Sequence, residues 1–520
     1  MRGKTLALGL ALLVLGLAVR LPALPAALPY MSYVDEGHVM HHAVHLLGER
    51  TWDPEFYYYG SLTYYLVAGA AVAWSPVYAA IHGHPLRDDL SPDPPQHYDV
   101  LEPVDVLVIG RLVTLIFSLG TVVLTGLLAR RLAGPAAGLF AAWLAALVPA
   151  LVARSAIVNV NPLVAFFVLA ALLFAEGARE GSRGRRDAVL AGVMIGLAAA
   201  TKYPAVLVCL PVALAVLLSA VPWQEKLRRL FLAGGAAAAS LVVAMPALVL
   251  RTANVLADVR ANTRFYEAVS SASFWDQAVH RAEWDLPLEH PEVGIVFLLL
   301  MAAGLAVALR EREWRRPVWG WLLFAAATLL LSVQYPFRPF RNLLALVPLG
   351  CILIAFLYAA LRRRLSRPLG LDLAAALLPV VLFAPALYRY SVFELQVKDT
   401  RTEALAWLAH HTRSGDRILI AEDLAFLPSR VDRLPRETAI KPWEKAWTRI
   451  WKRQFQYVVL GEITAPGDQS MILQPMREWI LKNYRLEAKL GTTKNLPGPF
   501  VFQGNGQILY ILRRVPRPEE

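Results

Sequence analysis

The sequence has 520 residues, of which 57% are hydrophobic and 18% are charged, and its mean hydropathy is +0.46. A soluble globular protein carries about a quarter charged residues, so this composition excludes that class and indicates a polytopic membrane protein. The net charge of +12 comes from short basic clusters between apolar runs. Such clusters are typical of cytoplasmic loops rather than of a surface that binds nucleic acid. We therefore expect the protein to contact membrane lipid and not to bind nucleic acid.

The first apolar run follows Arg2 and Lys4 and extends to about Pro25. A secretory signal peptide has similar flanks, but this run is longer than a usual signal core and no clean cleavage triplet follows it. We predict an uncleaved first span with its N-terminus inside.

Ten further apolar segments have about the length that a bilayer requires. With the N-terminus inside, every basic cluster between them, such as Arg130-Arg131, falls on the cytoplasmic side, as the positive-inside rule expects. The sequence therefore predicts about 11 transmembrane helices in the cell inner (plasma) membrane. The ten segments lie near 104–129, 135–153, 162–178, 187–201, 203–221, 230–250, 293–309, 317–333, 343–361 and 371–390.

Two places in this topology admit alternatives. Residues 61–81 are apolar but rich in Tyr and Trp, which favours an interfacial helix over a second span. Lys202-Tyr203-Pro204 either separates two short spans or kinks one.

The composition changes at about residue 391. Helical periodicity at Thr402 to His411 and strand-like runs farther on predict an α/β domain, which an odd number of spans places outside the cell. The sequence thus predicts a membrane module over 1–390, with external loops at 27–103 and 251–292, and an extracytoplasmic domain over 391–520. The expected strands are Arg417 to Ala421, Gln456 to Leu460 and Ile508 to Leu512, and a helix is expected from Gln474 to Tyr484.

Two adjacent carboxylates, Asp35 and Glu36, follow the first apolar run by about ten residues. Ionisable side chains at a membrane boundary are expensive and are usually retained for a function. A carboxylate there suits a general base, because a half-dry boundary can raise its pKa. The alternative is an interfacial acid pair that caps the following helix.

Histidines follow these acids at helical spacing, with His38, His41 and His42 on one expected face. Imidazole and carboxylate together suit zinc or manganese, so this is a candidate divalent-metal patch. The alternative is a polar stripe that faces water, and no cofactor is certain.

Cations in the predicted external connections form a second constellation. Lys202, Arg338 and Arg341 lie there, and Arg111 lies near the outer end of its span. Guanidinium groups bind phosphate oxygens in a bidentate manner and can stabilise negative charge on a phosphate leaving group. The alternative is that these side chains reach out to lipid headgroups.

Tyr58 and Tyr59 are candidates for substrate binding or for an interfacial aromatic belt, and the same ambiguity holds for the aromatic and acidic residues of the 251–292 loop. No P-loop or GxSxG motif occurs in a suitable context. This argues against ATP-driven transport and serine-hydrolase chemistry.

Taken in order, several short motifs resemble the GT-C class of membrane glycosyltransferases, especially the bacterial branch of the dolichyl-phosphate-mannose–protein mannosyltransferase and aminoarabinose-transferase family. Each motif is short, and the resemblance depends on their order and on the topology. The motifs are Tyr33-Val34-Asp35-Glu36, Asp53-Pro54, Tyr59-Gly60-Ser61-Leu62, Arg111, Arg154 to Pro162, Thr201-Lys202, Arg341-Asn342-Leu343-Leu344 and Asp399-Thr400-Arg401.

The resemblance implies a GT-C-like fold, a polyprenyl-phosphate-linked sugar donor and inverting transfer on the extracytoplasmic face. It implies that Asp35 is the catalytic base and that Glu36 supports it. Many relatives have an acid before the proline that opens the fourth span, whereas this chain has Asn161 before Pro162. An amide cannot act as a base, so Asn161 either binds substrate or marks a divergent member.

We therefore interpret the chain as a hexosyl or pentosyl transferase with a lipid, glycan or protein acceptor. The alternatives are a flippase or transporter of lipid-linked glycans and a degenerate, non-catalytic subunit of the cell envelope. A transporter would more naturally place charges at the bilayer midplane and show repeats or broken helices.

Overall fold

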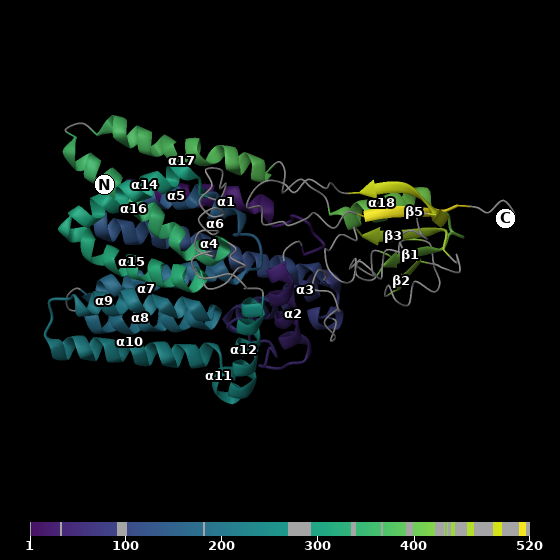
Figure 1. Ribbon diagram of the computed structural model, residues 1–520, viewed down its shortest axis with the longest axis horizontal. Coiled ribbons are helices and arrows are strands. Elements are labelled where there is room, and N and C mark those ends of the chain that lie inside the picture. The colour runs from purple at the N-terminus through teal and green to yellow at the C-terminus, as the bar shows by residue number, and fades with distance from the viewer. Residues whose placement is uncertain are drawn as a thin grey trace. The chain divides into compact units, whose positions relative to one another are not determined.

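The chain divides into two compact units, which are described separately (Figure 1). The larger unit contains Met1–Leu24, Val39–Pro92 and Asp105–Val392, and the second contains Pro25–His38, Asp93–Val104 and Phe393–Glu520. The structure is a computed structural model, and it describes residues 2–31, 34–90, 101–179, 183–268, 293–333, 340–365, 368–391, 399–421, 431, 434, 438–441, 455–461, 482–490 and 509–515.

Long apolar helices make up most of the larger unit and run side by side as a bundle (Figure 1). In this bundle α8 packs against both α7 and α10, and α16 packs against α14 and α5. The helices are α1 (Arg2–Arg20), α2 (Val34–Gly48), α3 (Leu62–His82), α4 (Val104–Ala133), α5 (Pro135–Leu147), α6 (Pro149–Ala153), α7 (Val160–Arg179), α8 (Gly184–Thr201), α9 (Cys209–Leu217), α10 (Trp223–Ala244), α11 (Ala247–Leu250), α12 (Thr252–Ala268), α14 (Ile295–Arg310), α15 (Arg312–Val333), α16 (Val347–Arg364) and α17 (Leu369–Arg389), with short 3-10 helices η1 (Leu21–Ala23), η2 (Leu86–Asp89), η3 (Tyr203–Val208) and η4 (Phe340–Leu346).

Small residues let α8 and α10 approach closely. A side chain added at Gly192 would collide with the backbone of Ala233, and one added at Gly196 would collide with Ala237. Spacing small residues four apart brings helix backbones together in membranes, where packing rather than hydrophobic burial drives association.

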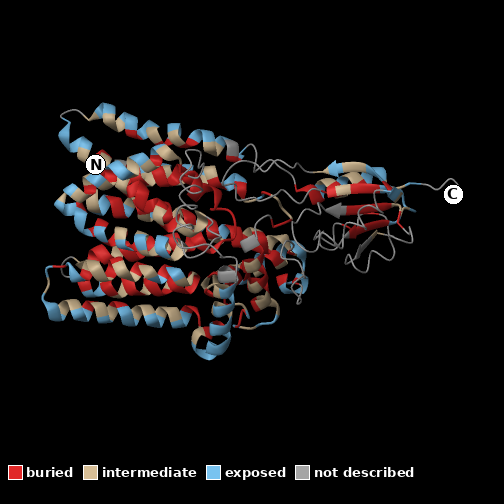
Figure 2. Ribbon diagram, viewed as in Figure 1, coloured by how far each residue is buried: buried red, intermediate tan, exposed pale blue. Residues whose placement is uncertain are grey.

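Six helices within the described residues are long and apolar enough to cross a membrane: α3, α4, α7, α10, η4 together with α16, and α17. Their burial differs, because 83% of the apolar window of α7 is buried inside the protein, against 17% in α10 and in α17 (Figure 2). The predicted helical membrane fold is confirmed. The count of about 11 spans stays a prediction, since several apolar helices, such as α5 and α14, are shorter.

Several helices of the larger unit gather at one end of the bundle, where α12 crosses the direction of the long helices (Figure 1). The helix α3, which we expected at the membrane interface, lies at this end and is also long enough to cross a membrane. The interfacial position of α3 stays a prediction.

The second unit contains a five-stranded sheet with the order β2-β1-β3-β5-β4. β1 pairs in parallel with β2 and β3, whereas β5 is antiparallel to β3 and β4. This sheet and the adjacent helix α18 confirm the predicted α/β character of the C-terminal part. The elements are α18 (Thr400–His411), β1 (Ile418–Ala421), β2 (Thr438–Lys441), β3 (Tyr457–Gly461), β4 (Tyr484–Leu490) and β5 (Leu509–Arg514).

The predicted helix from Gln474 to Tyr484 is wrong at its C-terminal end, because Tyr484 begins strand β4. Residues 474–481 lie outside the described residues. Strand β2 was not expected from the sequence.

A buried ion pair at the start of α18 packs against Tyr30, in the segment after the first helix. Asp399 caps α18 by accepting a hydrogen bond from the Arg401 amide, and its carboxylate also binds the Arg401 guanidinium at 2.8 Å. That guanidinium lies 3.8 Å from the ring centroid of Tyr30, which is fully buried. Residues near Tyr30 are therefore part of the second unit.

Candidate functional site

The larger unit contains a cavity of about 240 Å³. It brings together five residues that the sequence marks as candidates, namely Tyr58, Tyr59, Asn161, Lys202 and Arg341. These residues come from the loop before α3, the start of α7, the end of α8, and η4. The complete lining is Tyr58, Tyr59, Asn161, Val164, Lys202, Tyr203, Pro204, Ala205, Val259, Asn262, Thr263, Phe324, Thr328, Leu331, Ser332, Arg341, Asn342 and Ala345.

Lys202 enters the cavity because the chain breaks directly after α8. Pro204 has no N–H to donate to a carbonyl of a continuing α8, and its ring would clash with the preceding turn. Accordingly, α8 ends at Thr201, Lys202 is extended (φ −154°, ψ 120°), and η3 begins at Tyr203. Of the two possibilities for Lys202-Tyr203-Pro204, separation of two helices is the one observed.

Two amide oxygens hold the ammonium of Lys202. Its Nζ donates to Asn161 Oδ1 at 2.9 Å and to Asn342 Oδ1 at 2.7 Å. Amide oxygens are neutral, so these two partners orient the ammonium without adding negative charge next to it. The site therefore presents a directed cation, together with Arg341, to a single cavity.

Asn161 is itself held in place at the first turn of α7. Its backbone N–H and its side-chain Nδ2 donate to Asn159 Oδ1 at 2.7 and 2.6 Å. Asn159 acts as an N-cap residue does, by accepting from a backbone amide at the helix start. Asn161 therefore contacts Asn159 through Nδ2 and Lys202 through Oδ1.

The segment of residues 56–61 before α3, here called the tyrosine loop, packs directly against the end of α8. A side chain at Gly60 would overlap the backbone of Ala200, so only glycine permits this contact. Tyr203 Oη donates to the carbonyl oxygens of Tyr57 at 2.8 Å and Tyr59 at 3.2 Å. The Tyr59 ring centroid lies 6.0 Å from Lys202 Nζ, within the range of a cation–π contact.

A second network holds the start of this loop. The Tyr57 hydroxyl and the backbone N–H of Glu55 both donate to Asp53 Oδ1, and Arg251 Nε donates to Asp53 Oδ2 at 3.2 Å. The backbone N–H of Tyr57 donates to Asp258 Oδ2 at 2.8 Å. Burial of the Tyr57 hydroxyl, together with its bond to Asp53, raises the pKa of Tyr57 well above its usual value. The tyrosine loop is thus tied to α12.

The other predicted site residues are not brought into this cavity within the described residues. Arg111 is fully buried in α4 and its Nη1 donates to Leu24 O at 2.7 Å. Asp35 and Glu36 lie in the first turn of α2, where Glu36 is fully buried, and both belong to the second unit. Arg338 and the side chain of Asp35 lie outside the described residues.

The predicted histidine patch lies on α2. His42 Nδ1 lies within hydrogen-bonding distance of the Pro54 carbonyl oxygen, at 3.0 Å, and its ring stacks on Phe56 with 4.5 Å between centroids. Within the described residues, no group of three or more His, Cys, Asp or Glu is placed to hold a metal ion. A metal site at His38, His41 and His42 stays a prediction, since the Asp35 side chain is outside that part.

Sequence reasoning missed several polar residues of the cavity wall. Thr328 and Ser332 project from α15, while Asn262 and Thr263 project from α12. The spacing of Thr328 and Ser332, four residues apart in an apolar segment, is a signal that could have found them. Tyr203 carried no such signal, because its role depends on carbonyl groups distant in sequence.

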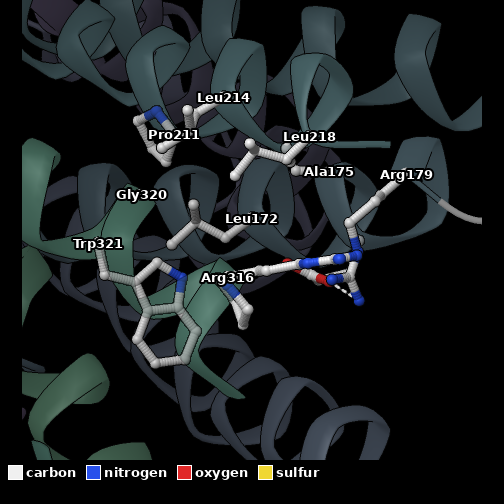
Figure 3. Close-up of a pocket in the computed structure, with 12 residues that line it drawn as sticks. Leu172, Ala175, Arg179, Pro211, Leu214, Leu218, Arg316, Gly320 and Trp321 are labelled. Atoms are coloured by element: carbon white, nitrogen blue, oxygen red, sulfur yellow. Dashed lines mark ion pairs between the residues drawn. The ribbon is translucent and has the colours of Figure 1, made fainter. Parts of the chain in front are cut away.

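A second, smaller cavity is unsuited to a substrate. It has a volume of about 10 Å³, roughly the space of one water molecule. Arg316 and Arg179 both line this cavity (Figure 3), and Arg179 forms an ion pair with Glu176 at 2.9 Å. Since Glu176 and Arg179 are near the C-terminal end of α7 and Asn161 is near its start, the two cavities lie at opposite ends of that helix.

A family model described as dolichyl-phosphate-mannose-protein mannosyltransferase matches residues 105–250, which include Arg111, Asn161 and Lys202. No curated protein matches the sequence significantly.

Solved structures share the fold at low sequence identity. ArnT from Cupriavidus metallidurans, in the apo state and bound to undecaprenyl phosphate, is 14% identical with a TM-score of 0.55; 98% of this chain and 98% or 97% of that chain are covered. An Archaeoglobus fulgidus oligosaccharyltransferase, tethered with an acceptor peptide, is 14% identical with a TM-score of 0.52 and coverages of 98% and 74%. The resemblance to GT-C membrane glycosyltransferases is therefore confirmed at the level of fold.

Proposed function

We propose that this GT-C-type chain is an integral membrane glycosyltransferase that moves a sugar from a polyprenyl-phosphate-linked donor to an acceptor on the extracytoplasmic face. The observation that carries the proposal is the cavity in which Lys202 and Arg341 meet the paired tyrosines. A protein of the same fold, ArnT from Cupriavidus metallidurans, has been solved with undecaprenyl phosphate bound.

Lys202 and Arg341 would hold the donor phosphate. Hydrogen bonds between charged partners are about twice as strong as neutral ones, and both cations are partly buried, where water screens them less. As the sugar leaves, negative charge grows on the phosphate. Cations already held in position stabilise that charge more than they stabilise the ground state, which lowers the barrier.

The remaining wall suits a sugar. The faces of Tyr58 and Tyr59 can stack on the apolar side of a pyranose or furanose ring. The hydroxyls of Thr328 and Ser332 and the amide of Asn262 can hydrogen-bond to its hydroxyl groups. The cavity volume of about 240 Å³ favours transfer of a single hexose or pentose over a long glycan.

The transfer step would be a single displacement. A hydroxyl or amine of a lipid, glycan or protein acceptor attacks the anomeric carbon, and the bond from that carbon to the phosphate oxygen breaks with its electron pair leaving on the phosphate. Asp35, in the first turn of α2, accepts the acceptor's proton, with Glu36 in support. Configuration at the anomeric carbon is inverted.

The test is sugar transfer by purified protein from a panel of radiolabelled polyprenyl-phosphate sugars, with donor binding measured separately. Wild type should transfer at least one sugar, and Asp35→Asn should bind that donor normally but lose transfer at least about a hundredfold, as loss of a general base does. Glu49→Gln, in the exposed turn after α2, is the matched control and should transfer normally.

Two results would contradict the proposal. Donor binding without transfer by wild type would indicate a flippase or a non-catalytic subunit. Full transfer by Asp35→Asn would keep the enzyme class but remove Asp35 as its base.

A further inference from the structure

An arginine-rich groove lies between the ends of α4, α7 and α8. Its volume is about 430 Å³, and it is open to the surroundings. Four arginines and one aspartate line it, so the groove carries an excess of three positive charges. The lining residues are Leu127, Arg130, Arg131, Leu173, Phe174, Arg183, Arg186 and Asp187.

The floor of the groove is apolar. Leu127 comes from α4, where its side chain is 42% exposed, and Leu173 and Phe174 come from α7. An exposed leucine on a helix of this hydropathy faces hydrocarbon, while the arginines at the helix ends face the polar boundary. The groove thus joins an apolar slot to a cluster of guanidinium groups.

The groove is remote from the cavity that contains Lys202. Asn161 lines the cavity and Phe174 lines the groove, and both belong to α7. Thirteen residues of α-helix correspond to about 20 Å. The groove is therefore a separate site near the opposite membrane boundary, where the predicted topology has the cytoplasmic leaflet.

We propose that this groove binds the headgroup of an anionic phospholipid, with its acyl chains over Leu127, Leu173 and Phe174. Charge complementarity supports this occupant, because guanidinium groups bind phosphate oxygens through paired hydrogen bonds. Basic pockets between membrane helices on the cytoplasmic side are suited to anionic lipids. The proposal is independent of the proposed transferase activity.

Arg185 provides an internal comparison. It lies between Arg183 and Arg186 but does not line the groove, and its guanidinium instead binds Glu225 on α10 at 2.7 Å. Removing the charge of Arg185 or of Arg186 changes the net charge of the protein equally. Only the change at Arg186 removes a charge from the groove lining.

The experiment is native mass spectrometry of the purified full-length chain titrated with phosphatidylglycerol or with phosphatidylcholine of the same acyl chains. Wild type should bind phosphatidylglycerol about tenfold more tightly or better. Arg130→Gln and Arg186→Gln should each weaken phosphatidylglycerol binding roughly fivefold, as expected for one basic group near a lipid surface. Arg185→Gln should bind nearly as wild type does, and Arg130→Lys should lose less affinity than Arg130→Gln, because lysine keeps the charge but not the paired hydrogen bonds.

Three outcomes would overturn the proposal. Equal binding of the two lipids by wild type would remove the role of charge. Equal losses for Arg185→Gln and Arg186→Gln would indicate a general charge effect. Displacement of phosphatidylglycerol by an equal concentration of glycerol 3-phosphate would indicate a site for a soluble phosphate compound. The elution volume in size-exclusion chromatography and the melting temperature of each variant identify misfolding. If a glutamine variant fails to fold, the affinity of Arg130→Lys for phosphatidylglycerol can still be compared with that of wild type.

Discussion

Lys202 Nζ donates a hydrogen bond to Asn161 Oδ1 at 2.9 Å, joining the end of α8 to the start of α7. In the class that this chain resembles, many members have an acid at the position of Asn161. A carboxylate there would pair with Lys202 and reduce its attraction for a phosphate. The neutral amide orients the ammonium by accepting its hydrogen bond.

We expect Asn161→Asp to weaken binding of a polyprenyl-phosphate donor about tenfold, because a charged partner competes with the phosphate for Lys202. The measurement is donor affinity by titration of the purified protein. Asn159→Asp, which changes the neighbouring cap and not the direct partner of Lys202, should have a smaller effect. Tighter donor binding by Asn161→Asp would show that Lys202 does not bind the phosphate.

Lys202→Met should weaken donor binding by about 10- to 100-fold, the range for loss of a hydrogen bond between charged groups. Methionine preserves much of the chain length and volume, so the change is mainly in charge. Lys226→Met is the control, since Lys226 Nζ donates to Leu217 O in an exposed position and does not line the cavity. Similar affinities for the two variants would exclude Lys202 from the donor site.

Tyr203→Phe should loosen the tyrosine loop, because it deletes the hydroxyl that donates to the carbonyls of Tyr57 and Tyr59. We expect faster hydrogen exchange of the backbone amides of residues 57–60 and several-fold slower sugar transfer, while the fold is retained. Hydrogen-exchange mass spectrometry measures the first effect. The control is Tyr388→Phe, at a residue of α17 that is 67% exposed, which should change neither hydrogen exchange nor sugar transfer. Unchanged hydrogen exchange in Tyr203→Phe would show that the Tyr203 hydroxyl does not hold the tyrosine loop.

Arg401→Ala should lower the stability of the second unit by about 3 kcal/mol, since it leaves the buried carboxylate of Asp399 without its ion-pair partner. Arg485→Ala is matched to it, because Arg485 also pairs with an acid two residues away but is exposed. That change should lower stability by less than about 1 kcal/mol. Thermal unfolding of the full chain measures both, and equal shifts would argue against a structural role for the buried pair.

The sequence by itself indicated most of the apolar helices, because apolar length and basic flanks are local properties; α12 lies in the expected loop 251–292, and the segment expected over 135–153 is divided into α5 and α6. The segment expected near 104–129 is α4, and the break expected at Lys202-Tyr203-Pro204 separates α8 from η3. In the second unit, α18 and strands β1, β3 and β5 were expected to within a few residues. Strand β4 was missed although Tyr484, Leu486 and Leu490 alternate with charged residues, since a helical period was read through Tyr484.

Only the tertiary structure decided which polar residues meet. Lys202 is 41 residues from Asn161 and 140 from Asn342, and no local pattern predicts either contact. Tyr203, Thr328 and Ser332 enter the cavity wall only because η3 packs against both α8 and α15. Element formation follows short-range periodicity and hydrophobicity, whereas a cavity follows from packing between segments far apart in the chain. The sequence could therefore nominate Lys202 and Arg341 as cations, but it took the packed helices to bring them to one cavity.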